Sequence, residues 1–248
     1  MKAWHFVSAD RKMRDGRPLP RTGRKLVHPG IERLQMCRQG LHASVRLIDA
    51  LRYAQGPILC RVEMTGEIVE SGDKVVGRER TILWRIDATE VLRAFARKCA
   101  LDVVHLWDAP DVVKRYLNTG DKSIRQEARD AAADAADAAH AAYAASAAYA
   151  AYAAYAAYAA AYAAYAAADA ADAAHAAYAA SAAYAAYAAY AAADAADAAY
   201  AAADAYAYAA AAAYAAYAAA ASREKQNKRL TRMVLAEYRR VANRRKSR

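Results

Sequence analysis

The chain has 248 residues, and its 36 lysines and arginines exceed its 26 aspartates and glutamates, which gives a net charge of +10. Its three cysteines are widely spaced and form no Cys-x-x-Cys pair, so the composition argues against a disulfide scaffold and against a zinc site. The first residues contain no apolar run of signal-peptide length, and aspartates interrupt the long alanine-rich part. We therefore expect no transmembrane segment and a cytoplasmic protein.

The charge is divided unevenly along the chain. Residues 1–130 carry a net charge of +8, residues 131–222 carry −7, and residues 223–248 carry +9. All nine glycines and all five prolines lie at or before Gly120, so irregular structure is expected only in the first half. The predicted organisation is an α+β head domain at 1–122, an Ala/Tyr/Asp triplet-repeat helix at 123–222 and a basic amphipathic helical tail at 223–248. The predicted fold class is thus a small α+β domain followed by a long Ala-rich α-helical rod.

Local patterns predict the elements of the head domain in chain order. Alternating apolar residues predict strands at 3–8, at 57–70 with a turn at Thr65-Gly66, and at 81–86. Apolar stripes at helical spacing predict helices at 45–54, at 91–101 after the capping pair Asp87/Glu90, and at 108–117 before a stop at Gly120.

Four blocks of the head domain resemble an uncharacterised domain of bacterial and phage proteins. The blocks are GLHAS (40–44), DALRYA (49–54), ILCRVEMTGEIV (58–69) and ERTILWRIDATEVLRAFARKCAL (79–101). That domain often stands at the N-terminus, ahead of a low-complexity repetitive tail. The resemblance covers residues 1–128 and implies no established activity.

The head domain also resembles mono-ADP-ribosyltransferases in the order of four short segments. These are Trp4-His5-Phe6, Gly40-Leu41-His42-Ala43, Leu59-Cys60-Arg61-Val62 and Glu79-Arg80-Thr81-Ile82. The resemblance implies NAD as the cofactor, with His5 at the nicotinamide ribose, His42 stacking where that family has a tyrosine, and Glu79 orienting the acceptor or a ribose hydroxyl. The alternative is that the two histidines are structural side chains and that Glu79 is a surface charge at a hairpin. We expect no metal site, because the histidines do not stand at metal-ligand spacings.

An alanine-rich repeat follows the head domain. The string AADAADAAHAAYAASAAYAAYAAY at 132–155 returns letter for letter at 167–190. Alanine is the best helix former, and neither Gly nor Pro follows Gly120, so one long helix is predicted. The Tyr, Asp, His and Ser positions recur about every 3.2 residues and wind around an α-helix as a left-handed stripe. We expect the segment to form a homo-oligomer, as a coiled coil whose helices wind around each other in a steep left-handed sense, or to pack on the head domain. A hairpin, a 3₁₀-helix and a repeat that only records codon expansion are the alternatives.

The last 26 residues predict a basic amphipathic helix whose apolar stripe includes Leu230, Val234 and Val241. The predicted contacts to nucleic acid or to an acidic partner are the cations around this stripe: Arg229, Arg232, Arg239, Arg240, Arg244, Arg245 and Lys246. A membrane surface, or the Asp-bearing helix of a neighbouring chain, is an alternative partner.

Together these patterns predict a structural or interaction protein, in which the head is displayed on a self-associating Ala-rich rod with a basic tip. One alternative is an ADP-ribosyltransferase-like enzyme that uses NAD in the head domain. Another is a nucleic-acid-binding protein that acts through its basic tail. Apart from NAD in the enzyme alternative, no cofactor is expected.

Overall fold

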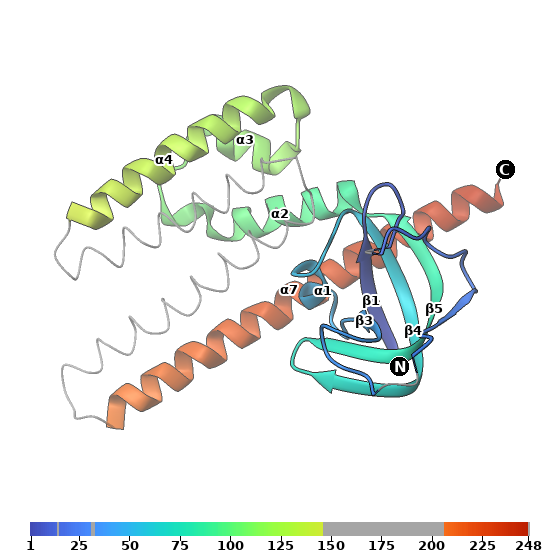
Figure 1. Ribbon diagram of the computed structural model, residues 1–248. Coiled ribbons are helices and arrows are strands. Elements are labelled where there is room, and N and C mark those ends of the chain that lie inside the picture. The colour runs from blue at the N-terminus through green and yellow to red at the C-terminus, as the bar shows by residue number, and fades with distance from the viewer. Residues whose placement is uncertain (14, 31–32, 146–205, 248) are drawn as a thin grey trace. The chain divides into compact units, whose positions relative to one another are not determined.

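A computed structural model describes residues 1–145, apart from 14 and 31–32, and residues 206–247 (Figure 1). The described residues fall into two compact units. The first consists of 1–92 and 229–247, and the second consists of 93–145 and 206–228. The middle of the expected triplet-repeat helix, 146–205, lies outside the described residues.

The first unit is built on an antiparallel sheet. Its strands are β1 (Lys2–Val7), β2 (Lys25–Val27), β3 (Leu41–Ala43), β4 (Ile58–Ser71) and β5 (Lys74–Asp87). The order across the sheet is β1-β4-β5-β2, and β3 also pairs with β5. With the helices described below, this sheet confirms the α+β class expected for the N-terminal region.

β4 and β5 form a long hairpin whose turn lies at Gly72, so the turn expected at Thr65-Gly66 is wrong (Figure 1). At Gly66 the strand continues, and the ladder shifts between the pairs Thr65–Glu79 and Ile68–Gly77. Gly66 has a φ of 72°, a left-handed conformation that glycine adopts without the strain of a side chain. The local turn signal is therefore a bulge, because strand pairing continues on both sides of it.

A second irregularity decides which side of the sheet the residues of β5 face. Arg61 pairs with Trp84, whereas the next residue, Val62, pairs with Ile82. Side chains alternate along a strand, and one extra residue reverses that alternation. Ile82 therefore faces the same side as Val62, and Trp84 faces the side of Arg61. Arg80, two residues before Ile82, shares the side of Ile82.

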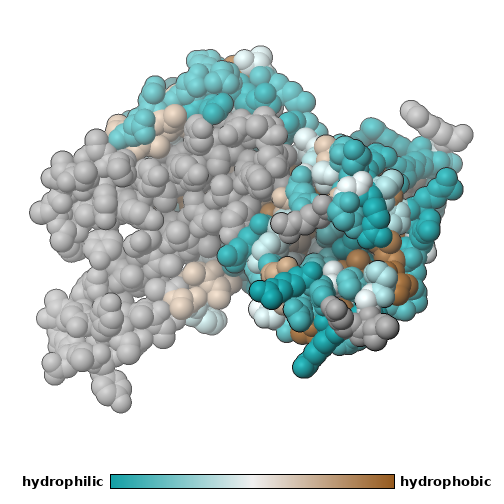
Figure 2. All heavy atoms as spheres, in the orientation of Figure 1, coloured by the Kyte–Doolittle hydropathy of each residue, from teal (hydrophilic) through white to brown (hydrophobic). Residues whose placement is uncertain are grey.

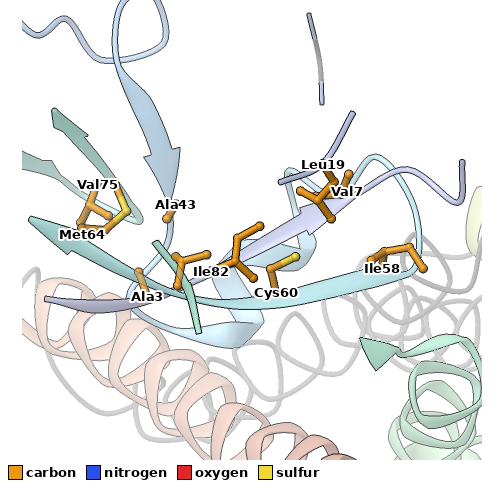
Figure 3. Packing of buried hydrophobic residues seen from close by; sticks show 10 residues of the cluster. Ala3, Val7, Leu19, Ala43, Ile58, Cys60, Met64, Val75 and Ile82 are labelled. Carbon is orange, nitrogen blue, oxygen red and sulfur yellow. The ribbon is translucent and has the colours of Figure 1, made fainter. Parts of the chain in front are cut away.

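Small and branched apolar residues fill one side of the sheet. Figure 3 shows the cluster, to which β1, β3, β4, β5 and one loop contribute Ala3, Val7, Ala43, Ile58, Cys60, Met64, Val75, Ile82 and Leu19. Each of these residues is at most 8% exposed. The alternation expected at the start of β4 is confirmed, because its even-numbered residues from Ile58 to Met64 all belong to this core.

Aromatic residues cover the other side of the sheet. Trp4 and Trp84 meet edge to face at 5.7 Å between ring centroids, and the Arg61 guanidinium lies 4.2 Å from the centroid of the Trp4 ring. Tyr238 stacks on Trp84, with ring centroids 4.3 Å apart and ring planes at 14°.

Tyr238 belongs to α7 (Tyr206–Lys246), the long C-terminal helix. Leu230 and Val234 lie on the same side of α7 as Tyr238, at intervals of four residues, and both are fully buried. The last part of α7 is thus docked on the first unit through its apolar side. Within the described residues, no helix is both long and apolar enough to cross a membrane.

The remaining helices are α1 (Leu47–Leu51), α2 (Thr89–Val103), α3 (Asp111–Thr119) and α4 (Arg125–Ala145), with short 3₁₀ turns at Val104–Leu106 and Lys122–Ile124. Of these helices, α2 begins and α3 ends at a local signal, whereas α1 and α3 begin without a side-chain cap and α1 is shorter than the helix expected at 45–54. Asp87 accepts hydrogen bonds from the backbone N–H and the hydroxyl of Thr89, which confirms Asp87 as the cap, and α2 begins two residues before the predicted 91. Gly120, with a φ of 69°, donates its N–H to the Tyr116 carbonyl and ends α3 as expected.

Candidate functional site

The candidate site is a pocket of about 440 Å³ in the first unit. It is lined by β1, by residues of the loop that follows it, by residues 37–44, by α1 with the residues after it, and by Lys74 and Arg80 of β5. Its volume falls in the range of small-molecule sites. The face of the described residues seen in Figure 2 is mostly hydrophilic with limited hydrophobic areas, so that face offers no broad apolar docking surface.

Arg80 is the most unusual residue of this pocket, which we call the Arg80 pocket. Its guanidinium is buried, with the residue only 4% exposed, and Nη1 donates a hydrogen bond of 2.8 Å to the His42 carbonyl. Its Nε is buried without a hydrogen-bond partner, and Arg80 forms no ion pair with any described carboxylate. Burial lowers the pKa of Arg80 to about 10, so the group remains positively charged near neutral pH.

Arg80 reaches this pocket because of the extra residue of β5, Leu83, which lies between Ile82 and Trp84 and is skipped in the pairing with β4. Without the extra residue, Arg80 would share the side of Trp84, on which the aromatic residues lie. Asp15 lines the same pocket and acts on Arg80 only from a distance, without an ion pair. A buried charge without a close ion-pair partner is costly, since desolvation of an ion is offset only by such a partner. Such a charge lining a pocket favours an anionic ligand.

The two histidines expected from the sequence both line the Arg80 pocket. Nε2 of His42 accepts a hydrogen bond of 2.9 Å from the backbone N–H of Cys37, so this nitrogen carries no proton. Burial is the main cause that lowers the pKa of His5 well below 6.5, followed by the positive charge of Arg80 and the nearby His42. His5 is therefore neutral at pH 7.

Glu79 lies elsewhere. It does not line the Arg80 pocket, and its Oε2 accepts hydrogen bonds from Thr65 Oγ1 at 2.6 Å and from Lys25 Nζ at 2.8 Å. These bonds hold the pKa of Glu79 below its usual range. Glu79 and Arg80 are neighbours on β5, so they point to opposite sides of the sheet. The structure brings His5 and His42 together without Glu79, and the catalytic roles of all three stay predictions.

Other charged residues make the pocket walls positive overall. Arg17, Arg38 and Lys74 line it together with one carboxylate, Asp15. Asp15 is bound by Arg17 through a pair of 2.6 Å, so the aspartate is already compensated. The walls therefore suit a ligand that carries negative charge.

A series of side-chain contacts crosses the rim of the pocket at Lys74. Its ammonium donates to Cys37 Sγ at 3.1 Å and lies 3.8 Å from the centroid of the Tyr53 ring. The Tyr53 hydroxyl in turn donates to Asp73 at 2.7 Å. The hydrogen bond to Cys37 raises the pKa of Lys74, so its ammonium persists across the neutral range.

Sequence reasoning missed Arg80, Cys37 and Lys74 as pocket residues. Arg80 stands in a strand with several charged residues, and only the bulge shows that its side chain turns inward. Cys37 and Lys74 come from separate segments that meet through the pairing of β3 with β5. The one sequence feature that points to any of the three is the position of Cys37, which stands three residues before the GLHAS block that contains His42.

The predicted basic contacts lie around the docked side of α7. The tip presents exposed cations in Arg239, Arg240, Arg244, Arg245 and Lys246; Arg232 is exposed as well, and Arg229 is half-buried. Nε of Arg240 donates to Glu237 at 2.8 Å. The contact of these cations to nucleic acid or an acidic partner stays a prediction.

Comparison with known proteins identifies the region that holds the pocket. Residues 1–94 match the family described as a Domain of unknown function (DUF7666). Neither the curated proteins nor the solved structures contain a match to this chain. The matched region includes every residue that lines the Arg80 pocket. Among the residues that the structure describes, no group of three or more His, Cys, Asp or Glu side chains could hold a metal ion.

Proposed function

We propose that the N-terminal domain binds an anionic small molecule in the Arg80 pocket, with a phosphate or carboxylate group of the ligand at the Arg80 guanidinium. The observation that carries this proposal is the buried Nε of Arg80, which has no partner within the described residues. An anion at the guanidinium would supply the close counter-charge that Asp15, which forms no ion pair with Arg80, does not provide.

NAD is the first ligand to test. It carries a diphosphate, which suits the cations of the pocket walls, and the resemblance to mono-ADP-ribosyltransferases implies it. Further support comes from His5 and His42, which stand on separate strands and line the same pocket. A dinucleotide is large for a volume of about 440 Å³, so part of it would extend beyond the rim.

Calorimetric titration of the full chain with NAD, ADP-ribose and inorganic diphosphate tests this proposal. Arg80→Met is expected to weaken binding by at least about tenfold, because it removes a charge-assisted hydrogen bond in a desolvated site. The matched control is Arg85→Met. Arg85 is also on β5 and donates to the Pro20 carbonyl, but it does not line the pocket. Equal effects of the two variants, or no binding of any of the three compounds, would refute the proposal.

ADP-ribosyl transfer from NAD is the finer version of this proposal. Its weak point is Glu79, which is held by Lys25 and Thr65 away from the pocket. Release of nicotinamide from NAD tests it directly. Glu79→Gln reduces a true transferase reaction, whereas it leaves simple NAD binding unchanged. Loss of nicotinamide release in His42→Ala but not in Glu79→Gln would assign a different set of catalytic residues.

A second candidate function is nucleic-acid binding by the tip of α7. The observation in its favour is that the apolar side of the tip is docked through Leu230, Val234 and Tyr238, while the cations at its end are exposed. Docking disfavours insertion into a membrane, which needs a free apolar side. Filter binding of single- and double-stranded DNA across salt tests the candidate, since phosphate contacts weaken steeply as salt rises. Arg244→Gln with Arg245→Gln reduces the salt slope by about 2 if both contact phosphates.

The larger assembly also remains a proposal. Display of the head on a self-associating Ala-rich rod is supported by α4 and α7, which are helical where the repeat begins and ends. Light scattering together with circular dichroism on the full chain tests it. A monomeric mass at micromolar concentration would contradict self-association.

A further inference from the structure

We propose that Cys37 is a reactive thiol that exchanges with anionic disulfides of low molecular mass, which the Arg80 pocket binds beside it. The inference rests on the proposed anionic pocket, but it does not require that the natural ligand be NAD. Three observations carry it: the exposure of Cys37, its contact with Lys74, and the buried guanidinium of Arg80 in the same pocket, whose Nε has no hydrogen-bond partner among the described residues.

The backbone holds Cys37 in an unusual conformation at the rim of the pocket. Its φ is 64°, in the left-handed region that residues other than glycine seldom adopt. Its N–H donates to His42 Nε2, and the tight turn around it is closed by the Gln39 N–H, which donates to the Gln35 carbonyl at 2.9 Å. Strain of this kind persists where surrounding contacts over-determine it, and such positions cluster at functional sites.

The surroundings of the sulfur are those of reactive cysteines, which lie exposed in electropositive sites. Cys37 is exposed, and the Lys74 ammonium donates to its sulfur at 3.1 Å. The Tyr53 ring holds the other side of that ammonium and so limits its motion. Cys60 and Cys99 are buried, and burial raises the pKa of Cys60 to about 11, so the chain contains its own unreactive controls.

Arg80 selects the charge of the reagent. It lines the same pocket as Cys37, is buried, and has an Nε without a partner among the described residues. A carboxylate on the incoming disulfide would bind there, while Arg38 and Lys74 add positive charge to the walls. Positively charged clefts raise the local concentration and the association rate of anions.

The exchange is balanced without any further reagent. The thiol of Cys37 loses its proton to water, and the resulting thiolate attacks one sulfur of the disulfide. A new bond forms between Sγ and that sulfur while the original S–S bond breaks. The other half leaves as a thiolate with the bonding electron pair. Cys37 is thereby oxidised and the leaving half is reduced. The adduct occupies the pocket and excludes other anionic ligands.

The test compares two aromatic disulfides that differ in charge. The dianionic 5,5′-dithiobis(2-nitrobenzoate) and the uncharged 4,4′-dithiodipyridine are each mixed with the full chain, and release of the coloured thiol is followed. One thiol is expected to react fast, and mass spectrometry of the digest places the adduct on Cys37. Cys37→Ser removes the fast phase with both reagents.

The Arg80→Met variant decides whether the pocket binds the reagent. It is expected to slow the dianionic reagent by about tenfold relative to the uncharged one. Arg85→Met is the matched control and leaves the ratio of the two rates unchanged. Lys74→Met leaves Arg80 in place and slows both reagents, because it removes the ammonium from the sulfur. It slows the dianionic reagent more, because it also removes positive charge from the walls, so it serves if Arg80→Met does not fold.

Each outcome is decisive. If Cys37 reacts no faster than Cys60, or if the ratio of the two rates is the same in wild type, Arg80→Met and Lys74→Met, the proposal is overturned. In that last case, Cys37 is an ordinary exposed thiol. A fast anionic reaction without NAD binding in calorimetry supports this inference while refuting NAD as the ligand. NAD binding with an unreactive Cys37 supports NAD as the ligand while refuting this inference.

Discussion

The stacked pair Trp84 and Tyr238 offers a sharp test of how the C-terminal helix is held. Tyr238→Ala removes a half-buried ring whose centroid lies 4.3 Å from that of Trp84. Burying on the order of 100 Å² of apolar surface at about 25 cal/mol per Å² stabilises by about 2.5 kcal/mol. We therefore expect Tyr238→Ala to lower the free energy of unfolding by about 2–3 kcal/mol.

The interaction between the two rings is isolated by a double-mutant cycle. Stacked aromatic pairs contribute about 0.5–1.5 kcal/mol beyond the area they bury. The double variant Trp84→Ala/Tyr238→Ala should therefore be more stable than the sum of the single losses implies, by about 1 kcal/mol. A matched control stands on the same helix. Tyr217 is 73% exposed, and Tyr217→Ala should change stability by less than about 0.5 kcal/mol.

Urea unfolding provides the measurement, followed by tryptophan fluorescence and by circular dichroism. Both probes should report one transition if the end of α7 unfolds together with the sheet. A coupling energy within about 0.3 kcal/mol of zero would mean that the two rings do not interact in solution. The reasoning that docks α7 on the first unit through Tyr238 would then be refuted.

Three further results are expected. The pKa of His5 is lowered in the folded state, so at acidic pH the unfolded chain binds one more proton than the folded chain. At pH values below about 6.5, the free energy of unfolding should therefore decrease by up to about 1.4 kcal/mol per pH unit. In urea titrations, His5→Gln should remove this part of the pH dependence. Gly40 has a φ of 117°, and Gly40→Ala would place a Cβ against the Val76 side chain, whereas the Cβ of Gly16→Ala meets nothing within 4 Å. In thermal unfolding, Gly40→Ala should lose about 1–3 kcal/mol more of the free energy of unfolding than Gly16→Ala. Leu230→Ala should destabilise by about 2–5 kcal/mol in chemical denaturation, and a loss below about 1 kcal/mol would contradict its burial.

The relation between sequence and site is clearest in β5. Every residue of the Arg80 pocket lies in the stretch that the sequence marks as the head domain, and the sequence indicates two of them, His5 and His42. The sequence does not indicate Arg80, because it stands in a run of three charged residues with Arg78 and Glu79. Whether a strand residue points to the core or away from it depends on its register with the partner strand. The bulge at Leu83 alters that register, and no local sequence pattern predicts this bulge.

The sequence by itself determined what depends on neighbouring residues. Asp87 caps α2 and Gly120 ends α3, because capping and left-handed termination are local interactions. Tertiary structure decided what depends on distant ones. It turned the Thr65-Gly66 signal into a bulge and the unmarked Gly72 into the hairpin turn, since pairing along two 14-residue strands outweighs one local preference. It also placed Tyr238 on Trp84 and Cys37 beside Lys74, contacts between segments far apart in the chain that only the packed sheet brings together.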